Sequence, residues 1–582
     1  MNLSGSQKEA VCHGEGPLLV TAGAGSGKTR ALTERVIHLI NEGVSPERIV
    51  AITFTNKAAD EMKKRILGSI KSAPKDKLPY IGTFHAFCAR ILRKEAKSLG
   101  REFSFAIFDD DDSLKIIKRL VKSFNLSEDK KHSPRAVRKE ISRIKIGLLG
   151  ANEIESPLKE IFEEYERSLA EQNAFDFDDL ITKTVSFFEK NPTRLKKYQD
   201  RFDYILVDEY QDINKAQYLL VKLLAKEHGN LNVVGDDQQS IYAFRGADIK
   251  TFLDFAKDWP RTKIVHLGQN YRSTGNIVKA AAGVIGHNKL QIKKELWTEN
   301  ETGAAVGVLG AGSAEGEADI IASLILSRGF RESAILYRTN AQSRALEQSL
   351  NFHAIPYQMY GGVKFYARKE IKDILACLKY AFNPKDGVSK ERIEKTFRKA
   401  VAGKLIVSLP NLAKKLSLME LIGFVLKTSD YFELVARKYE NAEDRIENVR
   451  ELITFASEFE DLGSFMERVA LLGANDSINR VGEKDAPVKL MTIHLAKGLE
   501  FDDVYIAGVN EGTLPHHRSF FSENDLEEER RLMYVAMTRA KENLTLSFYS
   551  LASRFLYESP PELVSFSKTG QFEEKEDEIY LD

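Results

Sequence analysis

Cysteine is scarce in this chain: only Cys12, Cys88 and Cys377 occur among 582 residues. Three thiols cannot build a disulfide framework and none stands in a CxxC pair, so we expect a reducing, cytoplasmic setting. Long apolar runs are missing too, since none reaches the roughly 18 residues that a membrane-spanning helix requires. The N-terminus, MNLSGSQKEAV, lacks a basic stretch followed by an apolar one, so the sequence predicts neither export nor a membrane partner.

An excess of charge of either sign is also absent. The 85 Lys and Arg residues balance 85 Asp and Glu residues, which gives a formal net charge of zero. This balance excludes a globally basic protein, so any nucleic-acid surface must be a local patch or groove. Internal repeats of the solenoid type are not found either. At roughly 100–200 residues per domain, the length predicts three to five domains.

Short apolar runs alternate with helical stretches in two parts of the chain. This alternation is typical of an α/β fold with parallel sheets. The runs of the first part lie at 18–20, 49–54, 204–207, 231–234 and 264–267, and those of the second at 304–309, 334–337, 488–493, 504–507 and 544–548.

A helical, highly charged stretch interrupts each part, and the strand pattern resumes after it. We therefore interpret both stretches as insertions into a host domain. The expected domains are residues 1–95 with 185–268, interrupted by the insertion 96–184; residues 269–366 with 485–560, interrupted by the insertion 367–484; and an acidic C-terminal tail at 561–582.

A glycine-rich loop follows the first apolar run. A phosphate-binding turn needs several backbone N–H groups that point inward, and glycine permits this turn. In this interpretation the Lys28 amine reaches the β- and γ-phosphates and the Thr29 hydroxyl reaches Mg²⁺, so ATP and Mg²⁺ are the expected ligands. The alternative, a chance glycine-rich turn, is opposed by the strand before the loop and the helix after it. The loop consists of Ala22, Gly23, Ala24, Gly25, Ser26, Gly27, Lys28 and Thr29, with Ala22 where the strict pattern has glycine.

Two carboxylates end the apolar run at 204–207. Asp208 is placed to hold Mg²⁺ through water, and Glu209 to orient and deprotonate the attacking water. By itself the pattern fits an ordinary strand that ends in a charged turn equally well. Beside a phosphate loop it favours nucleotide hydrolysis.

An ordered series of motifs extends over nearly the whole chain. The motifs are Gln7 ahead of the loop, the loop itself, TFTNKAA at 53–59, GTFH at 82–85, VDEYQD at 207–212, GDDQQSIY at 235–242, NYRS at 270–273, TIH at 492–494, AKGLEF at 496–501 and YVAMTRA at 534–540. With these motifs the chain resembles the superfamily 1 DNA helicases of the UvrD/Rep/PcrA type.

The resemblance implies two RecA-like P-loop NTPase domains, each interrupted by a mainly helical insertion (1B-like at 96–184, a reduced 2B-like one at 367–484), with ATP between the domains. Arginine fingers of such enzymes neutralise charge on the transferred phosphoryl group. The implied roles are adenine reading by Gln7, stacking on the base by Tyr271 with Arg30 near it, γ-phosphate sensing by Gln239, arginine fingers at Arg272 and Arg539, and contact with the sugar or phosphate side by Glu500.

The resemblance also implies a track for single-stranded DNA, where bases stack on aromatic side chains. Phe244 stands where the family usually has Trp, so we expect somewhat weaker stacking. Phe54 by itself would fit a core aromatic better, and in FDFDDL at 175–180 DNA contact through Phe175 or Phe177 and a structural role are equally compatible. The implied track residues are Phe54, His85, Tyr242, Phe244, Arg245 and His494.

The expected activity is therefore that of an ATP-dependent helicase that moves 3′ to 5′ on single-stranded DNA and unwinds duplexes in repair or replication restart. Its expected partners are single-stranded DNA, junctions of single and double strands, and unidentified repair or replication proteins. The rival is a DNA-stimulated ATPase that strips proteins from single strands with little unwinding. The rival is favoured by the short second insertion, which lacks the family's Gly-Ile-Gly element near residues 401–404.

Two further clusters are expected to be structural. The acidic run at 109–112 precedes a helical pattern, so we interpret it as a helix cap rather than a metal site. His516 and His517 have no cysteine or third ligand nearby, so a solvated loop is expected there.

Overall fold

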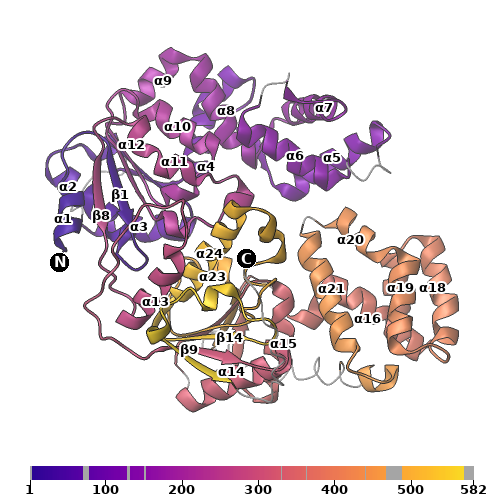
Figure 1. The fold of residues 1–582 in the computed structure, drawn as a ribbon. Coiled ribbons are helices and arrows are strands. Elements are labelled where there is room, and N and C mark those ends of the chain that lie inside the picture. Colours follow the sequence, from indigo (N-terminus) through magenta and orange to yellow (C-terminus); the bar gives the residue numbers. More distant parts are fainter. Residues whose placement is uncertain are drawn as a thin grey trace. The chain divides into compact units, whose positions relative to one another are not determined.

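The structure, a computed structural model, describes residues 3–69, 78–126, 132–149, 153–329, 331–361, 363–439, 441–466, 469 and 488–568. It divides into two compact units, Met1–Arg272 with Lys289–Glu299 and Ser273–Asn288 with Asn300–Asp582. Each unit contains a parallel sheet covered by helices (Figure 1), which confirms the predicted α/β class. Among the described residues, no helix combines the length and apolar character needed to cross a membrane.

The first unit is built on a six-stranded parallel sheet with the order β3-β2-β6-β7-β1-β8. Its strands are β1 (Leu18–Ala22), β2 (Ile49–Thr53), β3 (Tyr80–Thr83), β6 (Tyr204–Val207), β7 (Leu231–Gly235) and β8 (Lys263–Leu267). Its helices are α1 (Gly5–Val11), α2 (Lys28–Asn41), α3 (Asn56–Ser69), α4 (Phe84–Glu95), α10 (Lys215–Ala225), α11 (Ile249–Leu253) and α12 (Phe255–Asp258).

Alternate residues of these strands enter two different cores, because successive side chains of a strand point to opposite faces. Leu19 packs into a core that includes Phe84 and Leu220 of α4 and α10. Its neighbours Leu18 and Val20 pack into another core, with residues of α2 and α3. The central strands are therefore buried on both faces, which explains why they read as continuous apolar runs.

The first insertion leaves the sheet after α4 and returns before β6. Short strands β4 (Ala106–Phe108) and β5 (Ala174–Asp176) pair in parallel, and a small core joins the helices around them. Asp109 caps the first helix of the insertion through a 2.8 Å hydrogen bond from the Asp112 amide, which confirms the predicted cap. The helices are α5 (Asp110–Ser123), α6 (Pro134–Gly147), α7 (Leu158–Glu171) and the first half of α8 (Phe177–Lys190). The second half of α8 and the next helix, α9 (Pro192–Gln199), pack into the core of the first sheet.

A buried cation ties four elements of this insertion together. The Lys145 amine of α6 lies 2.7 Å from Glu166 of α7, 2.8 Å from Asp176 of β5 and 2.8 Å from Asp179 of α8. The lysine side chain is only 3% exposed. A carboxylate buried in this way is stable only beside a positive charge, so Lys145 holds the acidic groups in place.

The second unit is built on a seven-stranded parallel sheet with the order β11-β12-β10-β13-β14-β9-β15. Its strands are β9 (Val306–Gly310), β10 (Ser333–Tyr337), β11 (Tyr357–Met359), β12 (Val488–Thr492), β13 (Phe501–Ile506), β14 (Ala540–Phe548) and β15 (Val564–Lys568). The helices of this sheet are α13 (Gly275–Gly286), α14 (Ala314–Arg328), α15 (Ser343–Phe352), α23 (Ile493–Ala496) and α24 (Glu523–Met537).

The second insertion is a helical group with its own core, drawn in orange in Figure 1. Residues 401–404, where the resemblance would place a Gly-Ile-Gly element, lie inside one of its helices. The helices are α16 (Lys369–Phe382), α17 (Gly387–Thr396), α18 (Lys399–Leu412), α19 (Leu418–Ser429), α20 (Tyr431–Lys438) and α21 (Ala442–Ala456).

The C-terminal boundary differs from the prediction. Residues 561–582 were expected to form an acidic tail, but Val564–Lys568 is a strand of the second sheet and pairs with β9. This strand covers backbone groups that would otherwise leave β9 as an unpaired edge. The acidic residues at 569–582 lie outside the described residues.

The loop that contains His516 also differs from the prediction of a solvated loop. The His516 side chain is only 12% exposed, and its Nε2 atom lies 3.1 Å from Glu447 of α21. Glu443, Glu447 and Glu451 recur every four residues, so they share one face of this helix. Their basic partners in the second unit are Arg518, His516 and Arg344, respectively.

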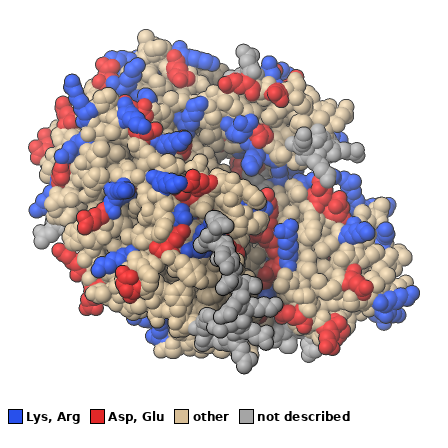
Figure 2. All heavy atoms as spheres, viewed as in Figure 1, with Lys and Arg blue, Asp and Glu red and all other residues tan. Residues whose placement is uncertain are grey.

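Charges of both signs are mixed over the visible surface, as Figure 2 shows. This mixture agrees with the zero net charge of the sequence. In its described residues, this face therefore has no large region of a single charge sign that could attract a charged ligand.

Replacement of Lys145 by methionine should destabilise the first unit strongly. The change would leave three acidic side chains without their buried cation, and breaking such a pair typically costs about 3–5 kcal/mol. The urea midpoint of unfolding measures the effect. The control is Lys139→Met, on the exposed face of the same helix; equal midpoints for the two variants would contradict the role given to Lys145.

Candidate functional site

Three loops that carry predicted site residues meet at one edge of the first sheet. Strands β6, β7 and β1 are neighbours in the sheet and run parallel. Carboxyl ends of parallel strands lie at the same edge, where α/β proteins bind ligands. The phosphate loop follows β1, Asp208 follows β6, and Asp236 follows β7. The sheet thus brings together motifs that lie far apart in the sequence.

The phosphate loop has the backbone that its glycines predict. Gly25 and Gly27 have φ angles of +67° and +82°, in the left-handed region that side chains disfavour. A Cβ atom on Gly25 would lie 2.8 Å from the Asn270 amide nitrogen and 2.9 Å from Cβ of Arg272. Lys28 is the first residue of α2, and the N–H groups at a helix N-terminus attract anions. This geometry fits the phosphates of a nucleotide.

Gln7 lies against this loop. Its side chain is buried; Nε2 donates a 3.0 Å hydrogen bond to the Ser26 carbonyl, and Oε1 accepts one of 3.2 Å from the Ser4 amide. A glutamine amide has two N–H groups and two acceptor lone pairs, so one of each remains for an adenine edge.

The residues predicted to hold Mg²⁺ are in contact with each other. The Thr29 hydroxyl donates a 3.0 Å hydrogen bond to the Asp208 carboxylate. Burial, together with the negative charge of Glu209, raises the pKa of Asp208 to about 7. A cation at this place would stabilise the ionised carboxylate, and oxygen atoms are the ligands that Mg²⁺ prefers. The donor set therefore fits a magnesium ion.

Glu209 adopts a backbone conformation that is unusual for a residue with a side chain. Its φ of 50° and ψ of 42° place it in the left-handed region. Strain of this kind is found preferentially at functional sites. The Glu209 carboxylate accepts a hydrogen bond from the Gln211 amide.

Residues 270–272 belong to the phosphate loop in space, although the sequence placed them in the second domain. The Asn270 amide donates a 2.8 Å hydrogen bond to the Ala24 carbonyl, and the Tyr271 N–H donates one of 3.0 Å to the Gly25 carbonyl. The first unit accordingly extends to Arg272. These bonds hold Tyr271, whose side chain is 45% exposed, and Arg272 beside the candidate nucleotide site.

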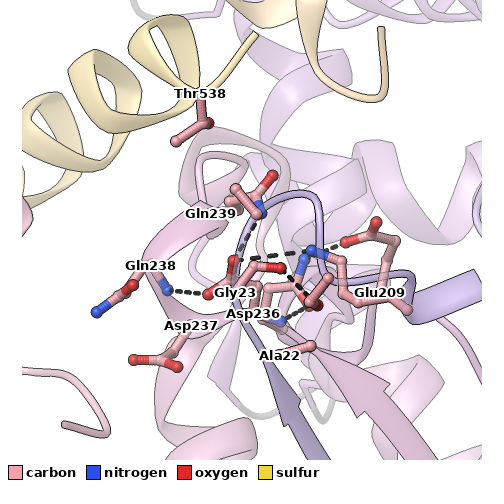
Figure 3. Close-up of polar contacts among 12 residues, drawn as sticks. Ala22, Gly23, Glu209, Asp236, Asp237, Gln238, Gln239 and Thr538 are labelled. Atoms are coloured by element: carbon pink, nitrogen blue, oxygen red, sulfur yellow. Dashed lines mark hydrogen bonds and ion pairs between the residues drawn. The ribbon is translucent and has the colours of Figure 1, made fainter. Parts of the chain in front are cut away.

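Asp236 is the polar centre of this edge. Figure 3 shows the hydrogen bonds that its carboxylate accepts, one of 3.2 Å from the Gln238 amide and one of 2.6 Å from the Gln239 side chain. The Lys28 amine lies 3.7 Å from the same carboxylate. Burial opposes ionisation of Asp236, but the positive charges of Lys294 and Lys28 outweigh it and hold its pKa below the usual range.

A partly exposed aromatic group lies shortly after Gln239 in the sequence. The Tyr242 and Phe244 rings lie 5.9 Å apart, and the Arg245 guanidinium lies 5.4 Å from the first ring and 5.5 Å from the second. Phe244 is 66% exposed. Tyr242 is half-buried. An exposed ring beside a second aromatic ring and a cation suits stacked bases and a phosphate backbone.

His85 and Phe177 form another aromatic pair, with ring centroids 4.1 Å apart. Burial lowers the pKa of His85 to about 4, so the imidazole is neutral at pH 7. Phe177 is 49% exposed, whereas Phe175 is 1% exposed and packs edge-on against Phe105. Of the two phenylalanines considered from the sequence, only Phe177 is therefore accessible to a ligand.

Phe54 has a partly structural environment. It follows β2, is half-buried and packs edge-on against Phe84, with centroids 6.4 Å apart. This contact agrees with the core interpretation considered from the sequence.

The second sheet places its predicted residues at opposite edges. Glu500 and Arg539 come directly before the neighbouring strands β13 and β14, at their amino ends. His494 follows β12, at its carboxyl end. The Arg539 guanidinium is buried and donates a 3.1 Å hydrogen bond to the Leu499 carbonyl and one of 2.9 Å to the Val535 carbonyl. Because Leu499 is the residue before Glu500, the first of these bonds holds the Arg539 side chain next to the segment that contains Glu500.

One residue beside the phosphate loop, Lys294, was not predicted from the sequence. It lies in the segment Lys289–Glu299 that belongs to the first unit, and its amine is 2.6 Å from Asp236. It stands outside the motifs that we recognised, and burial of a single lysine has no sequence signal. Phe177 was considered, but only the ring contact with His85 distinguishes it from Phe175.

The fold and this edge define a P-loop NTPase with two RecA-like domains, each interrupted by a helical insertion. Comparison with known families agrees with this class. The family model for the UvrD/REP helicase N-terminal domain matches residues 3–260, and that for the UvrD-like helicase C-terminal domain matches residues 265–444 and 426–551. The chain therefore belongs to the UvrD/REP helicase family.

Curated relatives cover almost the whole chain. The ATP-dependent DNA helicase PcrA of Staphylococcus epidermidis is 40% identical over 98% of this chain and 88% of its own length. The protein of that name from Bacillus subtilis is 39% identical over 96% of this chain and 86% of its own. The protein of that name from Staphylococcus aureus is 38% identical over 98% of this chain and 88% of its own length.

Replacement of Gly25 by alanine should weaken nucleotide binding without unfolding the protein. A left-handed alanine costs about 1–2 kcal/mol, and its Cβ would also displace Asn270, so we expect affinity to fall about tenfold or more. Titration with a fluorescent ATP analogue measures the effect. The control is Gly43→Ala, which has φ +95° but nothing within 4 Å of the added carbon. Equal affinity for both variants would contradict the assignment of the loop.

Proposed function

We propose that this chain is an ATP-dependent DNA helicase that translocates 3′ to 5′ on single-stranded DNA and unwinds duplexes, in DNA repair or replication restart. One observation carries the proposal. Gln239, whose side chain is hydrogen-bonded to Asp236 beside the phosphate loop, lies in the same short segment as Tyr242, Phe244 and Arg245. The 3′ to 5′ direction and the cellular process rest on the resemblance to the family. A cytoplasmic location rests on the scarcity of cysteine.

ATP is proposed to bind at the phosphate loop with Mg²⁺ held by Thr29 and Asp208. A bound magnesium ion would neutralise phosphate charge. Lys28 binds the β- and γ-phosphates, Glu209 takes a proton from the attacking water, and Gln239 senses the γ-phosphate. Arg272 and Arg539 serve as arginine fingers, of the kind typically worth about 10³–10⁵ in rate. Gln7, Arg30, Tyr271 and Glu500 complete the proposed nucleotide contacts.

The coupling between ATP and DNA is proposed to pass through the segment from Asp236 to Tyr242. The Gln239 side chain is held on Asp236, so a shift of this glutamine toward a phosphate would pull on the segment that bears the aromatic rings. Such a link makes base contacts depend on the state of the nucleotide. Closing and reopening of the two domains would then move the protein along one strand.

Single-stranded DNA is the proposed ligand of the aromatic groups, with junctions of single and double strands as the substrate for unwinding. The neutral His85 would contribute stacking and hydrogen bonding rather than charge. The proposed track residues are Phe54, His85, Tyr242, Phe244, Arg245 and His494, to which the accessible ring of Phe177 is added.

The domain scheme of the sequence is part of the proposal. Residues 1–95 with 185–268 and residues 269–366 with 485–560 form the nucleotide-binding domains, and 96–184 and 367–484 are their insertions. Residues 269–272 and 289–299 are the exceptions, because their contacts assign them to the first unit.

A rival function has one observation in its favour. Residues 401–404 lie within the continuous helix α18, where relatives have a duplex-contacting Gly-Ile-Gly element. A protein that binds duplex DNA weakly would displace proteins from single strands with little unwinding of duplexes. Repair or replication proteins remain possible partners under either function, and none is identified.

Strand separation on two tailed duplexes tests the proposal. With ATP and Mg²⁺, we expect unwinding from a 3′ single-stranded tail and none from a 5′ tail. Lys28→Ala is the control, since loss of the phosphate-binding amine should abolish hydrolysis and leave affinity for single strands largely intact. DNA-stimulated hydrolysis without unwinding from either tail would favour the rival function. Hydrolysis at the original rate in Lys28→Ala would contradict the site itself.

Replacement of Phe244 by alanine should weaken binding of single-stranded DNA by about 1–3 kcal/mol, because each stacked base contributes about that much. Fluorescence anisotropy with a labelled oligonucleotide measures the change. Phe352→Ala is the matched control, since this ring is 77% exposed but lies on α15 of the second unit. A Phe244→Ala variant that binds as tightly as the control would remove Phe244 from the track.

A further inference from the structure

Lys294 is a buried lysine at the candidate nucleotide site. Its side chain is 1% exposed, and its amine lies 2.6 Å from Asp236, 2.6 Å from Asp237 and 3.3 Å from the Ala22 carbonyl. Lysine is almost never fully buried unless it is paired, because its charge must be taken out of water. These contacts attach the segment Lys289–Glu299 to the end of β1 and to the loop after β7.

Two lysines share the Asp236 carboxylate. Lys294 lies 2.6 Å from Oδ1, and Lys28 of the phosphate loop lies 3.7 Å from Oδ2. The two lysines and the two aspartates together carry no net charge. Within this group the Lys28 contact is the long one, so Lys28 is the cation that exchanges Asp236 for another anion most easily.

A nucleotide requires this exchange. Lys28 must leave Asp236 in order to bind phosphate, and Asp236 then stays behind, buried, with Lys294 as its cation. Without Lys294, the Asp236 carboxylate would be left with Lys28 as its lysine partner. A buried carboxylate that would be left without a cation holds its partner tightly, because separation costs the full desolvation penalty.

We propose that Lys294 is a positioning residue of the ATP site: it neutralises Asp236 so that Lys28 is released to the phosphates. This inference rests on the proposed nucleotide binding at the same loop. By fixing Asp236, Lys294 also fixes the hydrogen bond that Asp236 accepts from Gln239.

A matched pair of double variants separates this role from a merely structural one. In the double variant Lys294→Met/Asp237→Asn, Asp236 keeps its negative charge and has lost Lys294, so it should bind Lys28 more tightly. Lys294→Met with Asp236→Asn has the same net charge and nearly the same volume, but removes the carboxylate that retains Lys28. Each pair deletes one positive and one negative charge, so neither leaves the additional buried charge that could prevent the single variant Lys294→Met from folding.

The measurement is equilibrium binding of a fluorescent, non-hydrolysable ATP analogue, with the melting temperature of each protein in the absence of nucleotide. We expect Lys294→Met/Asp237→Asn to bind about tenfold more weakly than Lys294→Met/Asp236→Asn, because only the first retains the carboxylate that holds Lys28. Lys293→Met, at an exposed neighbouring position, is the control and should bind normally. Lys294→Arg, which keeps the charge, should recover most of the affinity.

Equal affinities of the two double variants would overturn the proposal, whether both are weak or both are normal. A purely structural lysine would change the melting temperatures and leave the two affinities alike. Failure of the proposed function is distinguishable from this result, since the unchanged protein itself would then not bind the analogue.

Discussion

The parallel arrangement of β6, β7 and β1 is the constraint on which the candidate site depends. Parallel strands are connected by crossovers, so all their carboxyl ends lie at one edge of the sheet. For this reason the Thr29 hydroxyl and the Asp208 carboxylate, which are 179 positions apart in the sequence, lie within a hydrogen bond of 3.0 Å. The large helical insertion between them can be accommodated because it leaves after α4 and returns before β6, without disturbing the strand order.

Buried charge is the second theme of the fold. Lys145 in the first insertion and Lys294 at the nucleotide edge are both almost inaccessible, and each lies within 2.8 Å of two or more carboxylates. Burial of these groups is unfavourable in isolation, so each cluster is stable only as a complete set. In both cases the set joins segments that are distant in the chain, which fixes where an inserted or returning segment docks.

The two sheets present their functional candidates differently. In the first sheet the phosphate loop follows the carboxyl end of β1, and the segment that bears Tyr242 and Phe244 follows the carboxyl end of the neighbouring strand β7. The second sheet has Arg539 and Glu500 at the amino ends of its strands and His494 at a carboxyl end. Under the proposed function, nucleotide and DNA influence each other through the short segment between Asp236 and Phe244 of the first unit, which carries both the Gln239 contact with Asp236 and the aromatic rings.

The α/β class, the phosphate loop and the strands that are buried on both faces could be predicted from the sequence, because glycine turns and continuous apolar runs are local signals. β3, β11 and β15 were not expected, since they are short or contain few apolar residues, and β15 replaced part of the expected tail. Three further facts depend on the folded chain: Phe177 is accessible while Phe175 is in the core, His516 pairs with Glu447, and Lys294 contacts Asp236. These facts depend on contacts between segments far apart in the chain, and the burial and charge pairing that create them leave no pattern in the local sequence.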